Sequence, residues 1–289
     1  MNIVEFQNDT YNFPSSWDEL TQDQLEVLAK LQIQGCSRSE LLTKLALFIV
    51  GMRLAYKHQV IINGNYYYYV RHGITKIYLI SPEQLSFLAD SLSFLIDGSE
   101  IFPKLIRNPF KELHVKLFYR IFGPDDGLIN ITVDEFIQAE IERNIYEQTK
   151  NTLHFNRFLA ILWRPTCIKH PDGDQRAPLK SDDIFKRAKK ISSIAAHKKQ
   201  VMLWFYLGCL NFLMTKFKDV FSSEEGELPS SSFLVDYFMK ILTTLSKNDL
   251  SKVDNIRGKS LYDALYILQN IMEQNENNKP RNENSIQPS

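Results

Sequence analysis

The sequence predicts a mainly α protein, with a helical core and a small three-stranded antiparallel β meander. Three apolar stretches begin with Ser or Thr followed three residues later by Glu or Gln, at Thr21, Ser37 and Thr132. This spacing lets side chains satisfy the free backbone N–H groups at a helix start. Between residues 59 and 80 the pattern changes to short strands separated by glycine turns. A chain of 289 residues is long enough to bury a substantial core.

The two helices predicted after Thr21 and Ser37 are separated by Gly35, an arrangement that also fits a helix-turn-helix DNA reader. A recognition helix must expose polar side chains to base edges. The stretch 41–50 is instead apolar nearly all round, so we expect it to lie in a core. Its buried face is expected to run from Leu41 to Met52.

The meander is predicted from Asn63-Gly64, a strong hairpin signal, which lies between Val60-Ile61-Ile62 and four consecutive tyrosines, 66–69. A third strand is expected at 76–80. The tyrosines have two interpretations. They could form a stacking platform for single-stranded nucleic acid, or they could reflect β propensity with one face packed on helices.

The centre of the core is expected between residues 153 and 221. One apolar helix ends at Pro165, and another of the most apolar segments runs from Val201 to Met214. Two such helices must pack on each other or on common neighbours. The expected organisation is therefore an N-terminal part with helices and the meander (1–100), a helical domain (101–272) and a disordered tail (273–289), which has little to bury.

Composition excludes some classes of protein. Lys and Arg together number 34, as do Asp and Glu, and this balance argues against a main task of gripping a nucleic-acid backbone. Val201–Met214 is shorter than the roughly 20 residues of a membrane span, so no membrane association is expected. The first residues lack a basic stretch followed by an apolar core, which argues against a signal peptide.

The polar loop 167–176 is the best place to look for chemistry. Asp172-Gly173-Asp174 resembles the start of a calcium loop, but the remaining ligand pattern is missing. His170 has no nucleophile or orienting carboxylate that the sequence can pair with it. A solvated turn is the simpler interpretation, and we expect no enzyme activity, cofactor or metal.

One basic cluster stands out after the predicted helix start at Ser181. It suits an acidic partner, including an acidic helix of another protein, or is a solvated helix face. Its members are Lys186, Arg187, Lys189, Lys190, Lys198 and Lys199.

Three segments together resemble small phage and prophage proteins of Bacteroidota. The opening Pro14–Leu20 with Thr21 and Gln24 is similar to theirs, as is the hairpin and helix from Tyr66 to Leu95. Leu159–Pro165, followed by Arg176 and Trp204-Phe205-Tyr206, resembles phage tail assembly chaperones. In those proteins an "Ala-leucine-aromatic-Arg-Pro" helix precedes an aromatic-rich helix.

The resemblance implies a cytoplasmic helper that coats the tape-measure protein while the tail tube polymerises. Such a protein could lay an amphipathic helix in an apolar groove. The candidate partner-binding residues are Phe158, Trp163, Arg164, Trp204 and Phe205. Two alternatives stay open: a structural subunit that remains in the virion, and a nucleic-acid-binding regulator. The sequence also leaves open a homo-oligomer.

Overall fold

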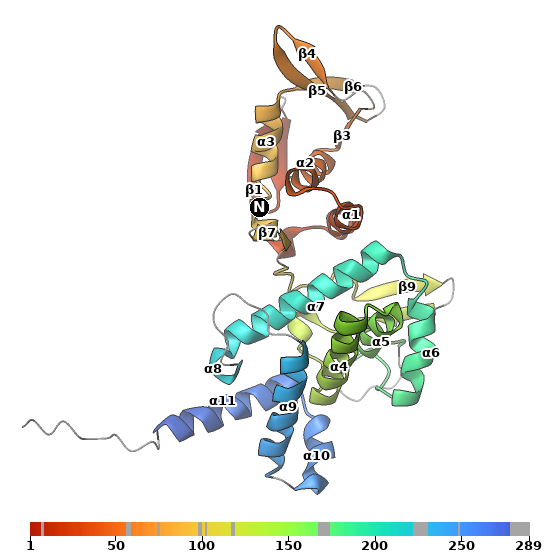
Figure 1. Ribbon diagram of the computed structural model, residues 1–289, viewed down its shortest axis with the longest axis vertical. Coiled ribbons are helices and arrows are strands. Elements are labelled where there is room, and N and C mark those ends of the chain that lie inside the picture. The colour runs from red at the N-terminus through yellow and green to blue at the C-terminus, as the bar shows by residue number, and fades with distance from the viewer. Residues whose placement is uncertain are drawn as a thin grey trace, which may run out of the picture. The chain divides into compact units, whose positions relative to one another are not determined.

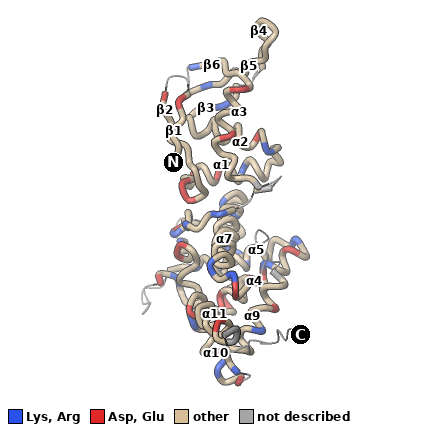
Figure 2. Tube along the Cα trace, turned by 90° about the vertical axis from the view of Figure 1, so that its left-hand side faces the viewer, with Lys and Arg blue, Asp and Glu red and all other residues tan. Residues whose placement is uncertain are grey.

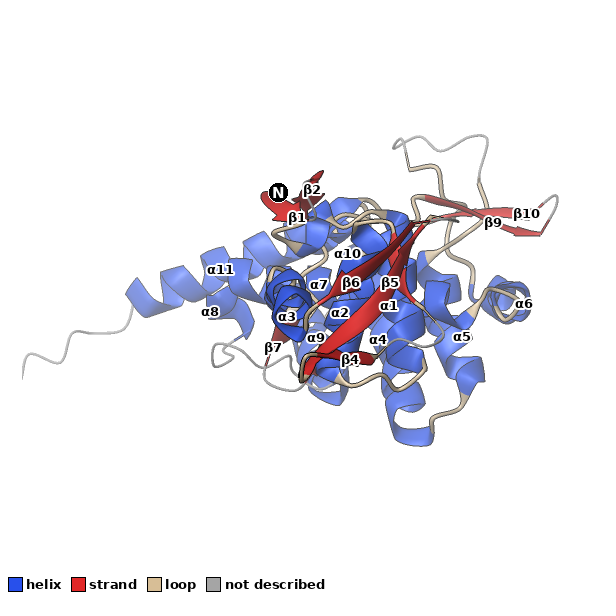
Figure 3. Cartoon of the chain, turned by 90° about the horizontal axis from the view of Figure 1, so that it is seen from above, coloured by secondary structure: helices blue, strands red, loops and turns tan. Residues whose placement is uncertain are grey.

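The computed structural model confirms a mainly α fold with small antiparallel sheets (Figure 1, Figure 3). No described helix combines the length and apolarity needed to cross a membrane. The structure describes residues 1–6, 9–55, 59–73, 76–97, 100–101, 103–116, 119–166, 174–221, 231–247 and 249–277.

The chain divides into two compact units, each built from two separate segments. The first unit contains residues 1–111 and 193–209, and the second contains 112–192 and 210–289. The expected division near residue 100 therefore differs from the observed one, because residues 193–209 pack with the N-terminal segment. The expected tail also begins too early, since helix α11 continues to Asn277. Residues 278–289 of that tail lie outside the described part.

In the first unit, three capped helices and a small sheet follow an N-terminal hairpin. Thr21 and Ser81 form complete capping boxes with Gln24 and Gln84. Ser37 accepts a hydrogen bond from the backbone N–H three residues on. The elements are β1 (Asn2–Phe6), β2 (Asp9–Phe13), η1 (Trp17–Glu19), α1 (Gln22–Ile33), α2 (Arg38–Ile49), β3 (Met52–Leu54), β4 (Val60–Ile62), β5 (Asn65–His72), β6 (Lys76–Ile80), α3 (Pro82–Asp90), η2 (Ser93–Leu95), β7 (Ile96–Asp97), β8 (Glu100–Ile101) and the first part of α7 (Ala196–Lys216).

The sheet contains the predicted meander and one further strand, β3. Asn63 and Gly64 join β4 to β5 with φ angles of 49° and 79°, the left-handed conformation that a two-residue hairpin turn needs. β3, β4 and β6 all pair antiparallel with β5. The expectation that Met52 lies on a helix is wrong. The chain leaves α2 at Val50, turns at Gly51 with φ 69°, and Met52 begins β3.

In the second unit, α4 is the central helix. It packs against α5 and α9, and α5 also packs against α6. Phe136 of α4 lies 4.5 Å from Phe238 of α9 between ring centroids. The elements are β9 (Glu112–Lys116), β10 (Tyr119–Phe122), η3 (Asp126–Leu128), α4 (Val133–Thr149), α5 (Thr152–Leu162), α6 (Ser181–Ile191), the end of α7, α8 (Lys218–Phe221), α9 (Ser231–Ser246), α10 (Leu250–Arg257) and α11 (Leu261–Asn277).

Candidate partner-binding groove and buried charge cluster

The five side chains expected to bind a partner are core residues. None is more than 2% exposed, and they are divided between the two units: Phe158, Trp163 and Arg164 in the second, Trp204 and Phe205 in the first. Trp204 packs edge-on against Trp17, with ring centroids 5.6 Å apart. Apolar side chains this deeply buried stabilise the fold itself. These five residues are therefore assigned to the cores of the two units.

The six basic residues are divided between the two units, four in the second and two in the first. Arg187 is buried on α6, where its Nη2 lies 3.3 Å from Asp183 Oδ2. Lys190 Nζ lies over the ring of Tyr119, 3.9 Å from its centroid. Lys186 and Lys189 are exposed on the same helix.

The other two basic residues belong to the first unit. Lys198 and its neighbour His197 lie 3.4 Å and 3.2 Å from the carboxylate of Glu26. Burial lowers the pKa of the Lys199 ammonium. The predicted basic cluster is thus divided among local contacts in two units.

Four charged side chains, two arginines and two carboxylates, meet inside the second unit. Arg164 Nη2 lies 2.7 Å from Glu135 Oε1. Arg176 Nη2 lies 3.3 Å from Glu135 Oε2 and 2.8 Å from Asp174 Oδ2. Each arginine is 1% exposed. The formal charges cancel, which is the condition under which a protein interior tolerates ionised groups.

The local backbone explains why these groups converge. Arg164 follows the end of α5 and exchanges two backbone hydrogen bonds with Phe122, the last residue of β10. Arg176 donates to the carbonyl oxygens of Leu162, at 3.2 Å, and Asn130, at 2.8 Å. The cluster therefore ties three loops to the start of α4, where Glu135 lies in the first turn.

Glu135 departs from its predicted role. Thr132 accepts the expected hydrogen bond from the Glu135 backbone N–H, at 3.2 Å. The Glu135 carboxylate, however, pairs with the two arginines rather than completing a capping box. The Thr132 side chain thus caps the helix as predicted, whereas the Glu135 side chain belongs to the charge cluster.

The pKa values of the cluster follow from burial and pairing. Burial lowers the pKa of the Arg164 guanidinium, and the charge of Glu135 offsets only part of this effect. Burial raises the pKa of the Asp174 carboxyl, but hydrogen bonds from Arg176 and the charges of both arginines outweigh it. The pKa of Asp174 therefore lies below its ordinary value.

An open pocket of about 760 Å³ borders the cluster. Its described lining offers the hydroxyls of Thr132 and Ser260 and four carboxylates, but no histidine or cysteine. Its charged lining residues are Asp134, Glu135, Arg164, Asp174, Asp254 and Arg257.

The described residues hold no group of three or more His, Cys, Asp or Glu side chains placed to bind a metal ion. Asp174, the last residue of the calcium-like motif, is paired with Arg176. His170, Asp172 and Gly173 lie outside the described residues.

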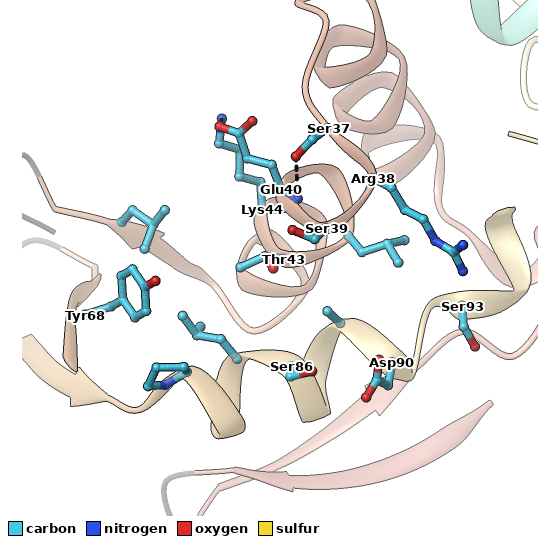
Figure 4. A pocket seen from close by; sticks show the side chains of 15 residues that line it. Ser37, Arg38, Ser39, Glu40, Thr43, Lys44, Tyr68, Ser86, Asp90 and Ser93 are labelled. Carbon is cyan, nitrogen blue, oxygen red and sulfur yellow. Dashed lines mark hydrogen bonds and ion pairs between the residues drawn. The ribbon is translucent and has the colours of Figure 1, made fainter. Parts of the chain in front are cut away.

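A second open pocket, of about 740 Å³, lies between α2 and α3 in the first unit (Figure 4). We call it the α2–α3 groove. Its apolar lining consists of Leu42 on α2, Leu54 on β3, and Pro82, Leu85 and Ala89 on α3. Tyr68 of β5 lies at one end of it (Figure 4). The sequence contained a signal for these positions, because both helices carry apolar residues at helical spacing.

The rim of the α2–α3 groove is polar. Ser39 and Thr43 on α2 and Ser86 and Asp90 on α3 lie along its two sides (Figure 4). Lys44 Nζ forms an ion pair with Glu40 Oε1 at 2.8 Å, and this hydrogen bond raises the pKa of the lysine. An apolar floor with a polar rim is the usual composition of a surface that binds another polypeptide.

Comparison with protein-family models, curated proteins and solved structures finds no match to this chain. A functional assignment therefore depends on the chain's own residues and geometry.

Proposed function

We propose that the chain is a non-enzymatic protein of phage morphogenesis, a tail assembly chaperone that binds helical segments of the tape-measure protein. The observation that carries this proposal is the α2–α3 groove, with an apolar floor between two helices. An amphipathic helix recognises such a groove by placing its apolar stripe on the floor. The polar rim then meets the polar flanks of the bound helix.

The proposed partner has a physical need for such a cover. A tape-measure chain of long amphipathic helices exposes apolar stripes until the tail tube surrounds it, and uncovered stripes of this kind lead to aggregation. A chaperone acting in the cytoplasm of the bacterial host would cover these stripes and leave as the tube grows. No catalytic group is required for this task.

The two arginines of the resembling stretch have a structural role in this chain. Arg164 and Arg176, the two arginines of the resembling stretch, meet at one buried carboxylate, Glu135. In this proposal they hold the fold, while the partner binds at the surface of the first unit.

The first test is a pull-down of the tagged protein from phage-producing cells after nuclease treatment, with mass spectrometry of the bound proteins. We expect one very long helical protein in the bound fraction and none of the tagged protein in purified particles. Capsid, neck or tail-tube proteins in the bound fraction, together with the chain in particles, would instead identify a virion subunit. Recovery of nuclease-released fragments alone would point to the nucleic-acid-binding regulator and contradict the proposal.

A matched pair of variants assigns the binding to the groove. Ser86→Trp places an indole at the mouth of the α2–α3 groove from an exposed position. Lys30→Trp adds the same side chain at an exposed position of α1 outside the groove lining. We expect Ser86→Trp to reduce recovery of the long helical protein about tenfold and Lys30→Trp to leave it unchanged. Equal recovery with both variants would exclude the groove as the binding site.

A further inference from the structure

The outer face of the β3–β6 sheet is largely apolar and partly exposed. In antiparallel strands, directly opposite residues share a face. Tyr69 lies opposite Leu79, and Arg71 lies opposite both Ile77 and Arg53. The alternation along β5 adds Tyr67, which lies opposite Val60. We call this set the outer sheet face: Arg53, Val60, Ile62, Tyr67, Tyr69, Arg71, Ile77 and Leu79.

Where β5 pairs with β3 and β6, the two faces of this sheet differ in burial. On the inner face Met52, Val70 and Ile80 are buried within the first unit. On the outer face Ile77 is 55% exposed and Leu79 is 42% exposed. A sheet with apolar side chains on both faces is normally covered on both. The described part of the first unit covers one.

The outer sheet face is also positively charged. Arg53 and Arg71 are directly opposite each other, an arrangement that destabilises a strand pair unless an anion lies nearby. Neither arginine side chain has an ion pair or hydrogen bond with any residue that the structure describes. Between Glu40 and Glu83 the sequence contains five Lys or Arg residues and no Asp or Glu. Figure 2 marks the Lys and Arg positions of β3, β5 and β6 in blue along the Cα trace.

We propose that the outer sheet face binds an acidic amphipathic helix of a partner protein. The helix would place its apolar stripe on Tyr69, Ile77 and Leu79, and its carboxylates beside Arg53 and Arg71. Tyrosine and arginine are enriched in protein interfaces. This inference rests on the proposed function and adds to it a second contact surface and the charge of the partner.

Two other occupants fit the same surface less well. Single-stranded nucleic acid binds through bases stacked on flat rings, whereas most of the apolar side chains here are the branched aliphatics Val60, Ile62, Ile77 and Leu79. A second copy of this chain, related by two-fold symmetry, would bring the same basic face against itself. An acidic helix satisfies both the aliphatic surface and the arginines.

The test uses the full-length protein and fluorescence anisotropy with three labelled probes at low salt. The acidic probe is a designed helix of about 20 residues with leucine at positions i, i+3, i+4 and i+7 of its apolar face and glutamate elsewhere. The basic probe has lysine in place of glutamate. The third probe is an oligothymidylate of about 20 nucleotides. We expect the acidic probe to bind at least about tenfold more tightly than either of the others.

Two double variants remove the two features of the face separately. Arg53→Glu with Arg71→Glu reverses the charge, and Ile77→Thr with Leu79→Thr removes apolar surface while keeping β propensity. Each double variant is expected to lower the affinity for the acidic probe at least about tenfold. Lys30→Glu and Ile33→Thr, at exposed positions of α1, are the matched controls and should change the affinity less than about twofold. Circular dichroism verifies that every variant is folded.

Each result has a definite meaning. If the acidic probe binds and both sheet variants bind it as well as the wild type, the site lies elsewhere, and the proposed function stands with the groove alone. If the oligothymidylate binds and the Arg53, Arg71 variant loses it, the occupant is nucleic acid and the inference is overturned. If no probe binds, sedimentation tests for a second copy, and either result overturns the inference. The pull-down tests the proposed function separately. Recovery of the long helical protein would leave the proposed function standing even if the inference about the outer sheet face fails.

Discussion

At the scale of single residues, the buried charge cluster has the largest energetic consequences. Arg164 Nε and Nη1 are buried and form no hydrogen bond with a described residue, so the close pairing of this guanidinium depends on Glu135. An ionised group left without its partner in a protein interior costs much more than the same group at the surface.

We therefore expect Glu135→Gln to lower the free energy of unfolding by about 3–5 kcal/mol. The control is Glu112→Gln, which removes an exposed carboxylate 2.9 Å from Arg120 and should cost less than about 1 kcal/mol. Urea unfolding followed by circular dichroism measures both. Equal effects of the two variants would show that the cluster does not depend on Glu135.

The pH dependence of stability provides a test of Asp174. Its pKa is lower in the folded chain than in the unfolded chain, where about 3.9 is usual. The ionised carboxylate thus stabilises the fold above the unfolded pKa, and this stabilisation is lost as the pH falls through the folded pKa. We expect wild type to lose more stability on acidification below about pH 4 than Asp174→Asn does.

Unfolding midpoints measured at several pH values, compared with those of Asp182→Asn, test this expectation. Asp182 is an exposed carboxylate on α6. Its removal controls for the loss of one negative charge. Parallel pH profiles for wild type and Asp174→Asn would contradict a lowered pKa of Asp174 in the folded chain.

The cluster also shows which contacts could be predicted from the sequence and which could not. The capping role of Thr132 was predicted from spacing, because it depends on residues within one helical turn. The pairing of Glu135 with Arg164 and Arg176 was not predicted, since spacing along the chain does not reveal which loops meet. The partner-binding role assigned to Trp163 and Trp204 came from the resemblance and from their aromatic character, and neither of these distinguishes a core from an interface.

At the scale of elements, Gly208 determines how closely α7 can approach its neighbour. A Cβ built at Gly208 would lie 2.3 Å from the backbone oxygen of Leu105 and 2.5 Å from its nitrogen. Alanine in place of glycine inside a helix normally stabilises it by about 1 kcal/mol. Here the backbone contact should outweigh that gain.

We expect Gly208→Ala to destabilise the protein by about 1–3 kcal/mol, the range for overpacked interiors. Gly258→Ala is the control, because its Cβ would lie 3.7 Å from the nearest atoms and its φ of −74° suits any residue. This control should be neutral or stabilising by up to about 1 kcal/mol. Thermal unfolding of both variants measures these two changes in stability. A stabilised Gly208→Ala would show that the close approach to Leu105 does not exist.

Elements with local signals were predicted well, and elements without them were missed. The capped helices α1 to α4 and the Asn63-Gly64 hairpin all depend on contacts between near neighbours in sequence. The hairpin β1–β2 was not predicted, and the stretch of β9–β10 was left open between helix and strand, because these strands are short and their pairing gives no comparable turn signature. The length of α7 was underestimated for a different reason: polar residues of its first turn conceal its start.

At the scale of the whole molecule, the first unit is completed by residues that come late in the chain. Trp17 packs on Trp204, and Glu26 pairs with His197 and Lys198. Leu105 contacts Gly208. During synthesis this unit therefore cannot complete its core until residue 209 has been made. A boundary placed at residue 100 or 111 would divide its core.

A fragment of residues 1–111 should consequently fail to form a stable first unit. Without α7, Trp17 loses the ring against which it packs, and buried apolar surface becomes exposed. Trp17 is the single tryptophan of this fragment, so its fluorescence reports on that site. We expect a red-shifted emission and no cooperative urea transition.

A second fragment joins 193–209 to 1–111 through a flexible linker and carries Trp204→Phe, so Trp17 remains its single tryptophan. It should regain blue-shifted emission and cooperative unfolding, since it contains both segments of the unit. Cooperative unfolding of 1–111 alone would show that the late segment is dispensable, and the first unit would then be an independent N-terminal domain.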